Sequence, residues 1–326
     1  MKNNLFANKK ILITGHLGFL GSNLSKELLK RKSRLVGIDK KKLNNKTVLT
    51  SSEIKKIKNI KADICNFTLI NKVIKENKIE LVFHLAAEAI VGKCFKNPLN
   101  AFSTNIKGTW YILEACRENP CVKEIIIASS DKAYGNNNKL PYKENYPLQG
   151  NHPYDVSKSC ADLIANTYYN SYQLPVCITR CGNIYGPGDV NFSRVVPDTI
   201  RSIIKNKKLF IRSNGKYTRD YIYIDDIVSG YLALAEKMRK NKLYGQAFNF
   251  SNHNPISVLE LVKLIYKSAG EKPNYQILDK AFMEIKDQYL SAQKAQKLLD
   301  WKPAYSLKKG LNKTINWYKN YFLAIS

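Results

Sequence analysis

The stretch Thr14-Gly15-His16-Leu17-Gly18-Phe19-Leu20-Gly21 places three glycines at intervals of three residues, between an apolar run and a helical pattern. Gly15 permits a tight turn, Gly18 lets the backbone approach a pyrophosphate, and Gly21 lets the helix pack on the strand. The phosphates would lie at the helix N-terminus, where free N–H groups and the helix dipole favour negative charge. This stretch therefore predicts a dinucleotide-binding turn.

Two aspartates downstream of the turn indicate which dinucleotide it would bind. Asp39 ends the next apolar run, roughly 20 residues after the turn, where a carboxylate accepts the ribose hydroxyls of NAD and repels a 2′-phosphate. Asp39 could instead cap a turn, and the lysines at 40–42 would tolerate NADP. Asp63 follows the third predicted strand and either reaches the adenine amino group or serves as a turn residue. The sequence favours NAD as the cofactor.

Short apolar strands alternate with helical patterns over the first two-thirds of the chain. This alternation predicts an α/β fold, a Rossmann-type doubly wound parallel sheet with a smaller C-terminal substrate-binding lobe. We expect residues 1–182 to form the NAD-binding domain, with the chain returning to it around 216–250, and residues 183–215 and 251–326 to form the lobe. Strands are expected at 10–14, 34–39, 57–62, 81–85, 124–128 and 176–179, and helices at 20–29, around 69–74, at 99–117 and at 153–172.

The charge of the chain is strongly positive, with 53 Lys and Arg against 26 Asp and Glu. The lysines are scattered in short clusters and do not interleave with aromatic residues, so we expect no nucleic-acid partner and instead an anionic substrate. No apolar stretch approaches the roughly 20 residues of a membrane span, and no signal peptide is expected at the N-terminus. These features predict a cytoplasmic protein.

Cysteines and histidines give no pattern typical of a metal site. The seven cysteines are an odd number without a Cys-x-x-Cys spacing, which favours reduced thiols. His16 and His84 have no Asp, Glu or Cys partner at ligand spacing, so both are interpreted as structural residues. No metal is expected.

The chemistry is predicted to lie in Ser129-Ser130-Asp131-Lys132-Ala133-Tyr134 and in Tyr154-Asp155-Val156-Ser157-Lys158. Tyr154 and Lys158 are four residues apart on a predicted helix and therefore share a face. A nearby ammonium and the nicotinamide charge lower the pKa of a phenol, so Tyr154 is the candidate base toward a sugar hydroxyl, with Ser130 donating to the same oxygen. Asp131 and Lys132 add an acid/base pair, or form only an exposed ion pair.

Together these motifs resemble the extended short-chain dehydrogenase/reductase superfamily, which acts on nucleotide sugars, over about residues 10–310. Further marks of the resemblance are His84-Leu85-Ala86-Ala87, Asn105-Ile106-Lys107-Gly108-Thr109, Arg180-Cys181-Gly182-Asn183-Ile184-Tyr185-Gly186-Pro187-Gly188 and Arg219-Asp220-Tyr221-Ile222-Tyr223-Ile224-Asp225-Asp226. The resemblance implies bound NAD and a homodimer formed through the helices at 99–117 and 153–172. The cofactor-binding residues that it implies are Gly15, Leu17, Gly18, Phe19, Leu20, Gly21, Asp39, Asp63, Ile64, Leu85, Ala86, Ala87, Asn105, Tyr154 and Lys158. The substrate-binding residues that it implies are Asn183, Val196 and Arg219, with Lys93 and Cys94 near the sugar.

Within that superfamily, the residues after the catalytic hydroxyl separate the reaction classes. Ser130-Asp131-Lys132 is similar to the CDP-glucose type of nucleotide-hexose 4,6-dehydratase, with Ser in place of the usual Thr. Those enzymes tend to have Arg-Pro-Trp where this chain reads Arg219-Asp220-Tyr221, a departure that touches the nucleotide base and not the reaction class. Lys132 would take the proton from carbon 5, and Asp131 would protonate the hydroxyl that leaves carbon 6.

Two alternatives stay open at the level of sequence. A 4-epimerase needs only Ser130, Tyr154 and Lys158 with rotation of the keto sugar, and a non-catalytic NAD-binding regulatory protein needs none of this chemistry.

Overall fold

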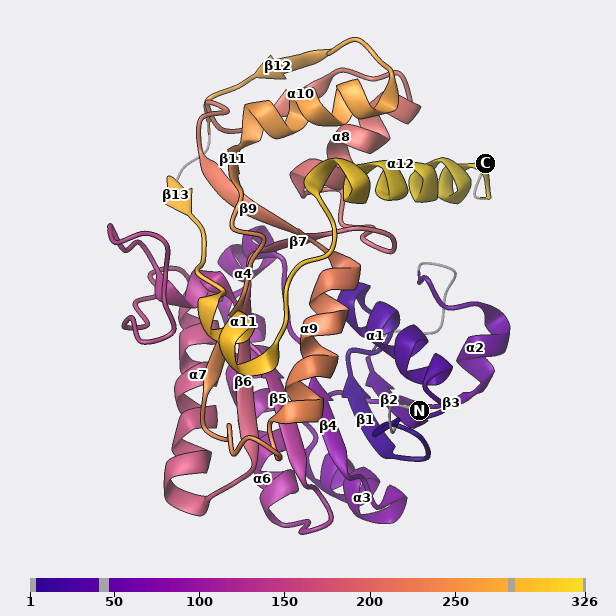
Figure 1. Ribbon diagram of the computed structural model, residues 1–326, viewed down its shortest axis with the longest axis vertical. Helices are drawn as coiled ribbons and strands as arrows, with labels where there is room; N and C mark the ends of the chain where they lie inside the picture. Colours follow the sequence, from indigo (N-terminus) through magenta and orange to yellow (C-terminus); the bar gives the residue numbers. More distant parts are fainter. Residues whose placement is uncertain (1–3, 41–46, 281–284, 325–326) are drawn as a thin grey trace.

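Most of the N-terminal two-thirds of the chain is built around one large sheet (Figure 1). The structure is a computed structural model that describes residues 4–40, 47–280 and 285–324. Seven parallel strands pair in the order β10-β6-β5-β4-β1-β2-β3. Their bounds are β1 Lys10–Thr14, β2 Arg34–Asp39, β3 Ile57–Lys61, β4 Leu81–His84, β5 Glu124–Ala128, β6 Val176–Cys181 and β10 Ala247–Phe250. The strand order reverses between β1 and β4, where parallel sheets of this kind bind ligands beyond the carboxyl ends of the strands.

Alternate residues of each strand enter two different hydrophobic cores. Ile11 and Ile13 lie in one core with Leu24 and Tyr231, whereas Leu12 lies in the other. A strand buried on both faces needs a continuous apolar run, which is what the sequence shows at β1, β4 and β5. The predicted doubly wound parallel sheet is confirmed.

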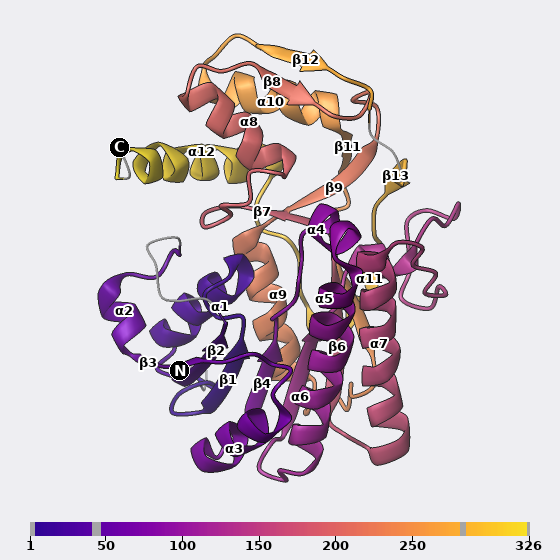
Figure 2. The same cartoon turned by 180° about the vertical axis from the view of Figure 1, so that it is seen from behind.

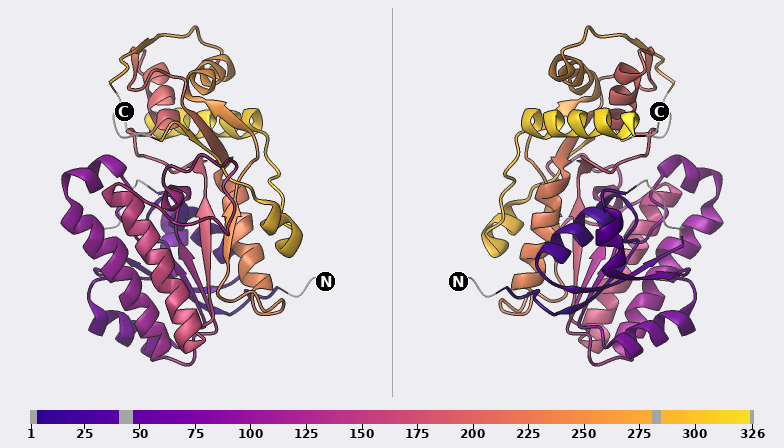
Figure 3. Two further views of the ribbon diagram at one scale, coloured as in Figure 1. Left: turned by 90° about the vertical axis from the view of Figure 1, so that its left-hand side faces the viewer. Right: turned by 90° about the vertical axis from the view of Figure 1, so that its right-hand side faces the viewer.

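Helices cover both faces of this sheet (Figures 2 and 3). α1 and α9 pack together, and α11 packs on α9 and β10, whereas α3 packs on α6 and α6 on α7. The bounds are α1 Phe19–Lys30, α2 Ser51–Lys55, α3 Phe67–Asn77, α4 Val91–Lys96, α5 Pro98–Phe102, α6 Gly108–Arg117, α7 Pro153–Tyr172, α9 Ile224–Lys237 and α11 Gln293–Leu299. Within residues 4–40, 47–280 and 285–324, none of the helices has the length and apolar character of a membrane span.

The second lobe lies beyond the carboxyl ends of the sheet strands (Figure 1). Its sheet centres on β9 (Thr218–Tyr223), which pairs with β7 (Asn183–Tyr185), β11 (Pro255–Ser257) and β13 (Asp287–Gln288). β8 (Leu209–Ile211) pairs with β12 (Tyr275–Ile277) in a separate ribbon. α8 (Val195–Ile204), α10 (Val258–Ala269) and α12 (Leu307–Leu323) pack against one another.

Two segments lie elsewhere than the sequence predicts. β9 falls in the range 216–250 expected to return to the NAD-binding domain, but it forms the centre of the lobe sheet, and the return begins with α9. α11 falls in the range 251–326 assigned to the lobe, but it packs on α9 and β10. The division of the chain into two domains stays a prediction. The chain passes between the large sheet and the lobe more often than the sequence predicts.

Two details of the helices also differ from the sequence prediction. The helix expected at 99–117 is interrupted by a π-helix, Ser103–Lys107, which contains Asn105. Two adjacent carboxylates before an expected helix, Asp225 and Asp226, predict a cap for it, but no side chain caps α9. The carboxylate of Asp226 instead accepts hydrogen bonds from the N–H groups of Ala304 (2.7 Å) and Tyr305 (3.2 Å), and so holds the segment that leads into α12.

Candidate active site

The glycine turn between β1 and α1 has the shape that a pyrophosphate requires. Gly15 adopts a φ of +72°, and a Cβ built on Gly21 would lie 2.1 Å from the carbonyl oxygen of Gly15. Gly18 precedes α1 and provides no side-chain cap, so the first N–H groups of the helix find no acceptor there. Such a helix end suits an anion. The turn therefore fits the phosphates of a dinucleotide.

We expect Gly21→Ala to weaken dinucleotide binding by about 10–100-fold, since an overpacked backbone contact costs about 1–3 kcal/mol. The added methyl group would meet main-chain atoms of Gly15 and His16, which cannot move away as a flexible side chain would. Calorimetric titration with NAD measures the effect. The matched control is Gly92→Ala, because no atom lies within 4 Å of a Cβ at Gly92. Equal affinities in the two variants would show that the turn does not hold the phosphates.

The rim of the predicted cofactor site is built from the ends of β2 and β4. Asp39 is buried, and its carboxylate accepts a hydrogen bond from the N–H of Leu17 at 3.3 Å. The hydroxyl of Thr14 accepts from the N–H groups of Leu85 and Ala86, each at 3.1 Å, which fixes the chain after β4 beside the glycine turn. Asp39, Leu17 and Leu85 therefore lie around one turn, as predicted from the sequence.

Asn105, Ile64 and Asp63 are further residues that are predicted to bind the cofactor. Asn105 is buried and its side-chain amide is bonded to both the N–H and the carbonyl of Glu88 and to the hydroxyl of Ser157. It thereby ties the segment that contains Ala87 to α7. Ile64 is buried against Gly108. Asp63 is exposed and caps its own turn by accepting from the N–H of Cys65 at 2.9 Å; a contact of Asp63 with adenine stays a prediction.

Ser130, Tyr154 and Lys158 come together at the carboxyl end of β5. Lys158 is buried on α7, and its Nζ donates to the carbonyl of Ala128 at 2.8 Å. Ser130 follows β5, and its hydroxyl caps the 3-10 helix Asp131–Tyr134 by accepting from the N–H of Lys132. A hydrogen bond from Ser130 also lowers the pKa of Tyr154. The hydroxyl and the Tyr-x-x-x-Lys pair therefore share one site.

Burial changes the pKa values of this pair in directions that the sequence did not predict in full. Desolvation raises the pKa of Tyr154 to about 12, more than the hydrogen bond from Ser130 lowers it. Desolvation also lowers the pKa of Lys158 to about 8. For the side chains of the protein alone, the net shift of the Tyr154 pKa is therefore upward, opposite to the direction expected from the sequence, and Lys158 Nζ is directed at a main-chain carbonyl. The lowering expected from the ammonium of Lys158 together with the nicotinamide charge stays a prediction.

Asp131 is not the exposed ion pair that the simpler interpretation expects. Its side chain is 5% exposed, and its Oδ1 accepts from the hydroxyl of Ser130 at 3.0 Å. Burial raises the pKa of Asp131, although the charges of Lys132 and Arg219 and the hydrogen bond from Ser130 oppose the shift. A raised pKa favours the protonated carboxyl, which can give a proton to a leaving group.

Two further carboxyls, which the sequence did not mark as functional, lie within electrostatic reach of Asp131. Burial raises the pKa of Asp155, and the charge of Lys132 lowers it. Burial raises the pKa of Asp220 to about 6, and the charge of Asp131 raises the pKa of both groups. Oδ1 of Asp155 and Oδ1 of Asp220 are buried without a hydrogen-bond partner among the described residues. These buried carboxyls give the site a polar environment for acid/base chemistry.

The predicted sugar residues on α4 differ in their positions. The thiol of Cys94 is buried, donates to the carbonyl of Glu88 at 3.4 Å, and contributes to the pKa values of both Tyr154 and Lys158. Burial raises the pKa of Cys94 to about 11. Lys93 is exposed. Of the two, Cys94 lies next to the predicted catalytic pair.

The predicted diphosphate residues lie on the lobe. Asn183 is half-buried on β7, and the side chain of Val196 is buried in the hydrophobic core, so a contact of Val196 with substrate would come from its backbone. Arg219 is buried, and its guanidinium donates to the carbonyls of Ile285 (2.5 Å) and Lys286 (2.8 Å). Binding of a diphosphate by Arg219 stays a prediction.

Arg194 is a cation near the site that the sequence interpretation passed over. It precedes α8, pairs with Asp189 at 3.1 Å, and its charge lowers the pKa of Tyr154. The only signal for Arg194 in the sequence was its place two residues before Val196, an implied substrate-binding residue. Arg194 brings positive charge from the lobe toward the tyrosine.

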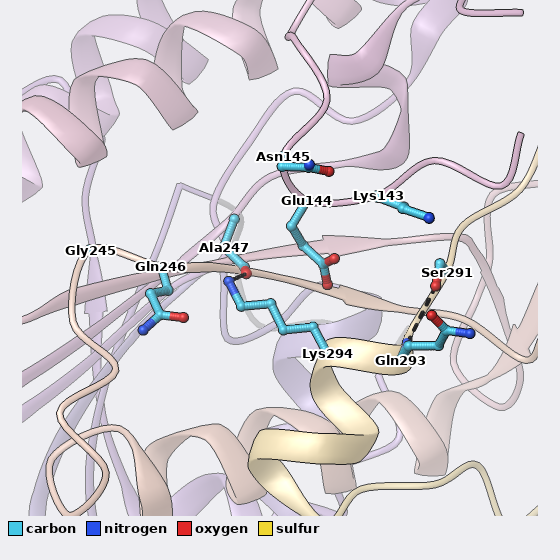
Figure 4. A pocket seen from close by; sticks show the side chains of 9 residues that line it. All are labelled: Lys143, Glu144, Asn145, Gly245, Gln246, Ala247, Ser291, Gln293 and Lys294. Atoms are coloured by element: carbon cyan, nitrogen blue, oxygen red, sulfur yellow. Dashed lines mark hydrogen bonds between the residues drawn. The ribbon is translucent and has the colours of Figure 1, made fainter. Parts of the chain in front are cut away.

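A separate hollow of about 470 Å³ lies along the edge strand β10 and the start of α11 (Figure 4). Glu144 reaches into it and accepts from the N–H of Asn249 at 2.9 Å. Asn249 in turn accepts from the hydroxyl of Tyr134 and donates to the carbonyl of Tyr142. These bonds attach the loop after Tyr134 to the sheet edge and fix the 3-10 helix that carries Asp131 and Lys132.

The histidines that the sequence assigned to structure have that role. Nδ1 of His84 is bonded to Thr14 (2.8 Å) and Nε2 to Thr109 (3.1 Å), and burial lowers the pKa of His84 to about 3. Nε2 of His16 is bonded to Asn59 at 2.6 Å. All seven cysteines lie in the described part of the chain and are free thiols.

A doubly wound sheet, a glycine turn shaped for pyrophosphate and a Ser, Tyr and Lys set at the end of β5 define an enzyme of the extended short-chain dehydrogenase/reductase class. The family described as GDP-mannose 4,6 dehydratase matches residues 12–314, and the chain belongs to this family.

Known relatives include both dehydratases and epimerases. The chain is 32% identical to dTDP-D-glucose 4,6-dehydratase of Dictyostelium discoideum (98% of this chain, 83% of that protein). It is 30% identical to CDP-glucose 4,6-dehydratase of Salmonella typhimurium (97% and 92%) and 31% identical to UDP-glucuronate 4-epimerase of Thermodesulfobacterium geofontis (94% and 95%). The crystal structure of dTDP-glucose 4,6-dehydratase from Bacillus anthracis in complex with NAD superposes with a TM-score of 0.86 at 28% identity (96% and 97%). The chain is thus an enzyme of the dehydratase/epimerase superfamily.

Proposed function

We propose that the protein is a nucleotide-sugar 4,6-dehydratase that uses NAD and converts an NDP-hexose, CDP-glucose or a similar sugar, into the NDP-4-keto-6-deoxy sugar. The observation that carries this proposal is the burial of Asp131, with its raised pKa, beside Ser130 and Lys132. A 4-epimerase needs no acid or base at these two positions, whereas loss of water needs both.

Tyr154, Ser130 and Lys158 are proposed to act at the oxygen on carbon 4. Tyr154 takes the proton from the hydroxyl, and Ser130 donates a hydrogen bond to the same oxygen. NAD, when bound, supplies the hydride acceptor and donor together with a positive ring charge. That charge and the ammonium of Lys158 lower the cost of forming the phenolate, which burial alone makes high.

Lys132 and Asp131 are proposed to remove water from the 4-keto sugar. The keto group acidifies the hydrogen on carbon 5, and Lys132 takes that proton. The carbon 6–oxygen bond then breaks, and Asp131 protonates the departing hydroxyl, so that one water leaves. Hydride is returned to carbon 6 and a proton to carbon 5, and no external reductant is consumed.

The identity of the nucleotide base rests on a separate set of observations. Ser130-Asp131-Lys132 and the 30% identity to the CDP-glucose enzyme support cytidine. Arg219-Asp220-Tyr221 departs from the pattern of that type, and the guanidinium of Arg219 is engaged by the main chain near Ile285. Other bases are therefore included in the test.

Incubation with CDP-, GDP-, UDP- and dTDP-hexoses in the presence of NAD, followed by mass spectrometry, tests the proposal. A product lighter by one water is expected with one or more of the four. Unchanged mass with a new isomer would instead identify a 4-epimerase. No turnover with retained NAD binding would identify a non-catalytic NAD-binding protein.

We also propose that the protein is a homodimer through α5, α6 and α7. α5 and α6 follow each other along the chain, and both pack beside α7 (Figure 2). Each of the three helices exposes a large apolar side chain: Leu99 (79%), Trp110 (43%) and Leu163 (54%). Exposed apolar side chains on adjoining helices are typical of an interaction surface.

Leu163→Glu is expected to raise the dimer dissociation constant by about 100-fold or more. A twofold interface loses each contact twice, and burying one leucine contributes about 1.5–3 kcal/mol. Light scattering over a concentration series measures the change. Leu323→Glu is the matched control, because Leu323 is 77% exposed on α12. A wild-type protein that is monomeric at all concentrations would contradict the proposal.

A further inference from the structure

Gln288 lies in the predicted site although no motif contains it. It stands on β13, opposite Arg219 in the lobe sheet, and is 156 residues from Lys132 in the sequence. Its side chain is fully buried, at 0% exposure. The lobe therefore brings an amide group to the side chain of the proposed base.

The two ends of this amide are used differently. Oε1 of Gln288 accepts a hydrogen bond from Nζ of Lys132 at 3.2 Å. Nε2 is buried and has no hydrogen-bond partner among the described residues. A buried donor without an acceptor costs about 1–3 kcal/mol, so a fold selected for stability alone would favour an apolar side chain here. In a sugar-binding site, the oxygens of a hexose can accept a hydrogen bond from this unpaired Nε2.

The contact with Lys132 has a consequence for its chemistry. A neutral amine has two hydrogens and one lone pair, and the lone pair must face carbon 5 for proton abstraction. When one N–H is held by Gln288, rotation about the last bond of the side chain is restricted and the direction of the lone pair is set. A second element also interacts with the charge of Lys132. Asp155, in the first turn of α7, has a pKa that burial raises and that this charge lowers.

We propose that Gln288 positions Lys132 through Oε1 and donates a hydrogen bond through Nε2 to an oxygen of the hexose. This inference rests on the proposed dehydratase function and extends it with a residue from the lobe. Gln288 gives and takes no proton or electron; it orders the base and the sugar relative to each other. The lobe strand β13 thereby contributes a residue to the acid/base site.

The test compares Gln288→Met with the control Gln276→Met, a glutamine exposed on β12 of the same lobe. For Gln288→Met we expect an unchanged or higher Tm, because an unsatisfied donor is removed. Exchange of the carbon-5 hydrogen with deuterated solvent and release of water should both fall by about 10–100-fold. Formation of reduced cofactor in a single turnover should stay within about threefold of wild type, because the groups at carbon 4 are untouched.

Two outcomes overturn the inference. One is a Gln288→Met protein that exchanges the carbon-5 hydrogen at the wild-type rate. The other is a Tm lowered by more than a few degrees with equal losses of carbon-4 oxidation and carbon-5 exchange, which would make Gln288 a packing residue.

A binding measurement separates this inference from the proposed function. Nucleotide sugar is titrated into Tyr154→Phe protein with and without Gln288→Met, so that affinity is measured with carbon-4 chemistry suppressed. We expect about tenfold weaker binding when Gln288 is replaced, since one lost hydrogen bond to the sugar is worth about 1–1.5 kcal/mol. If the wild-type enzyme releases no water but this difference is found, the dehydratase proposal fails and the sugar contact stands. Equal affinities would rule out the hydrogen bond between Gln288 and the sugar, whichever reaction the enzyme catalyses.

Discussion

Tyr154→Phe is expected to lower the rate of carbon-4 oxidation by about 10²–10⁴-fold, the range typical of a lost general base. Phenylalanine keeps the ring but removes the hydroxyl, which Ser130 and the charge of Arg194 stabilise as a phenolate. Because burial raises the pKa of Tyr154 to about 12, the wild-type rate should also rise with pH until other groups titrate. Stopped-flow absorbance of the reduced cofactor measures the oxidation step directly.

The fold should survive this substitution, and the affinity for NAD should fall much less than the rate of carbon-4 oxidation. Tyr172→Phe is the control on the same helix, since Tyr172 is 56% exposed and far along α7 from the site. An unchanged rate in Tyr154→Phe would show that another group removes the proton. A loss of NAD affinity equal to the loss of rate would assign Tyr154 to cofactor binding alone.

The sequence predicted the parts of this protein that depend on local patterns. The glycine turn, the apolar strands and the Tyr154 to Lys158 spacing are each set by neighbouring residues, because a turn, a buried strand and a helical face have their own periodicity. The seven-stranded sheet and the grouping of Ser130, Tyr154 and Lys158 are accordingly as expected.

The parts that the sequence did not predict depend on contacts across the chain. Gln288 and Asp220 reach the site only because β13 and β9 pair in the lobe, and a short strand such as Asp287–Gln288 has no periodicity to reveal it. The pKa of Tyr154 follows from burial, which local sequence does not give. Asp226 was misread for the same reason, since its partners, Ala304 and Tyr305, come from 78 and 79 residues away.

Asp131→Asn is expected to reduce water release by about 10²–10⁴-fold while carbon-4 oxidation stays within about tenfold of wild type. Asparagine has the size of the aspartate and can still accept from Ser130, but it has no acidic proton to give to the hydroxyl on carbon 6. Burial raises the pKa of Asp131, a direction that favours the protonated carboxyl that this role requires. Mass spectrometry of the sugar and absorbance of the reduced cofactor follow the two steps separately.

Lys132→Met distinguishes the base from the acid. Both variants should oxidise carbon 4 without releasing water, but they should differ in the exchange of the carbon-5 hydrogen. Asp131→Asn keeps the amine and should still exchange the carbon-5 hydrogen with deuterated solvent, whereas Lys132→Met should not. Asp225→Asn and Lys143→Met are the controls, an exposed aspartate and an exposed lysine outside the site. If both active-site variants release water at the wild-type rate, Asp131 and Lys132 are not the acid and the base, and other groups carry out the dehydration.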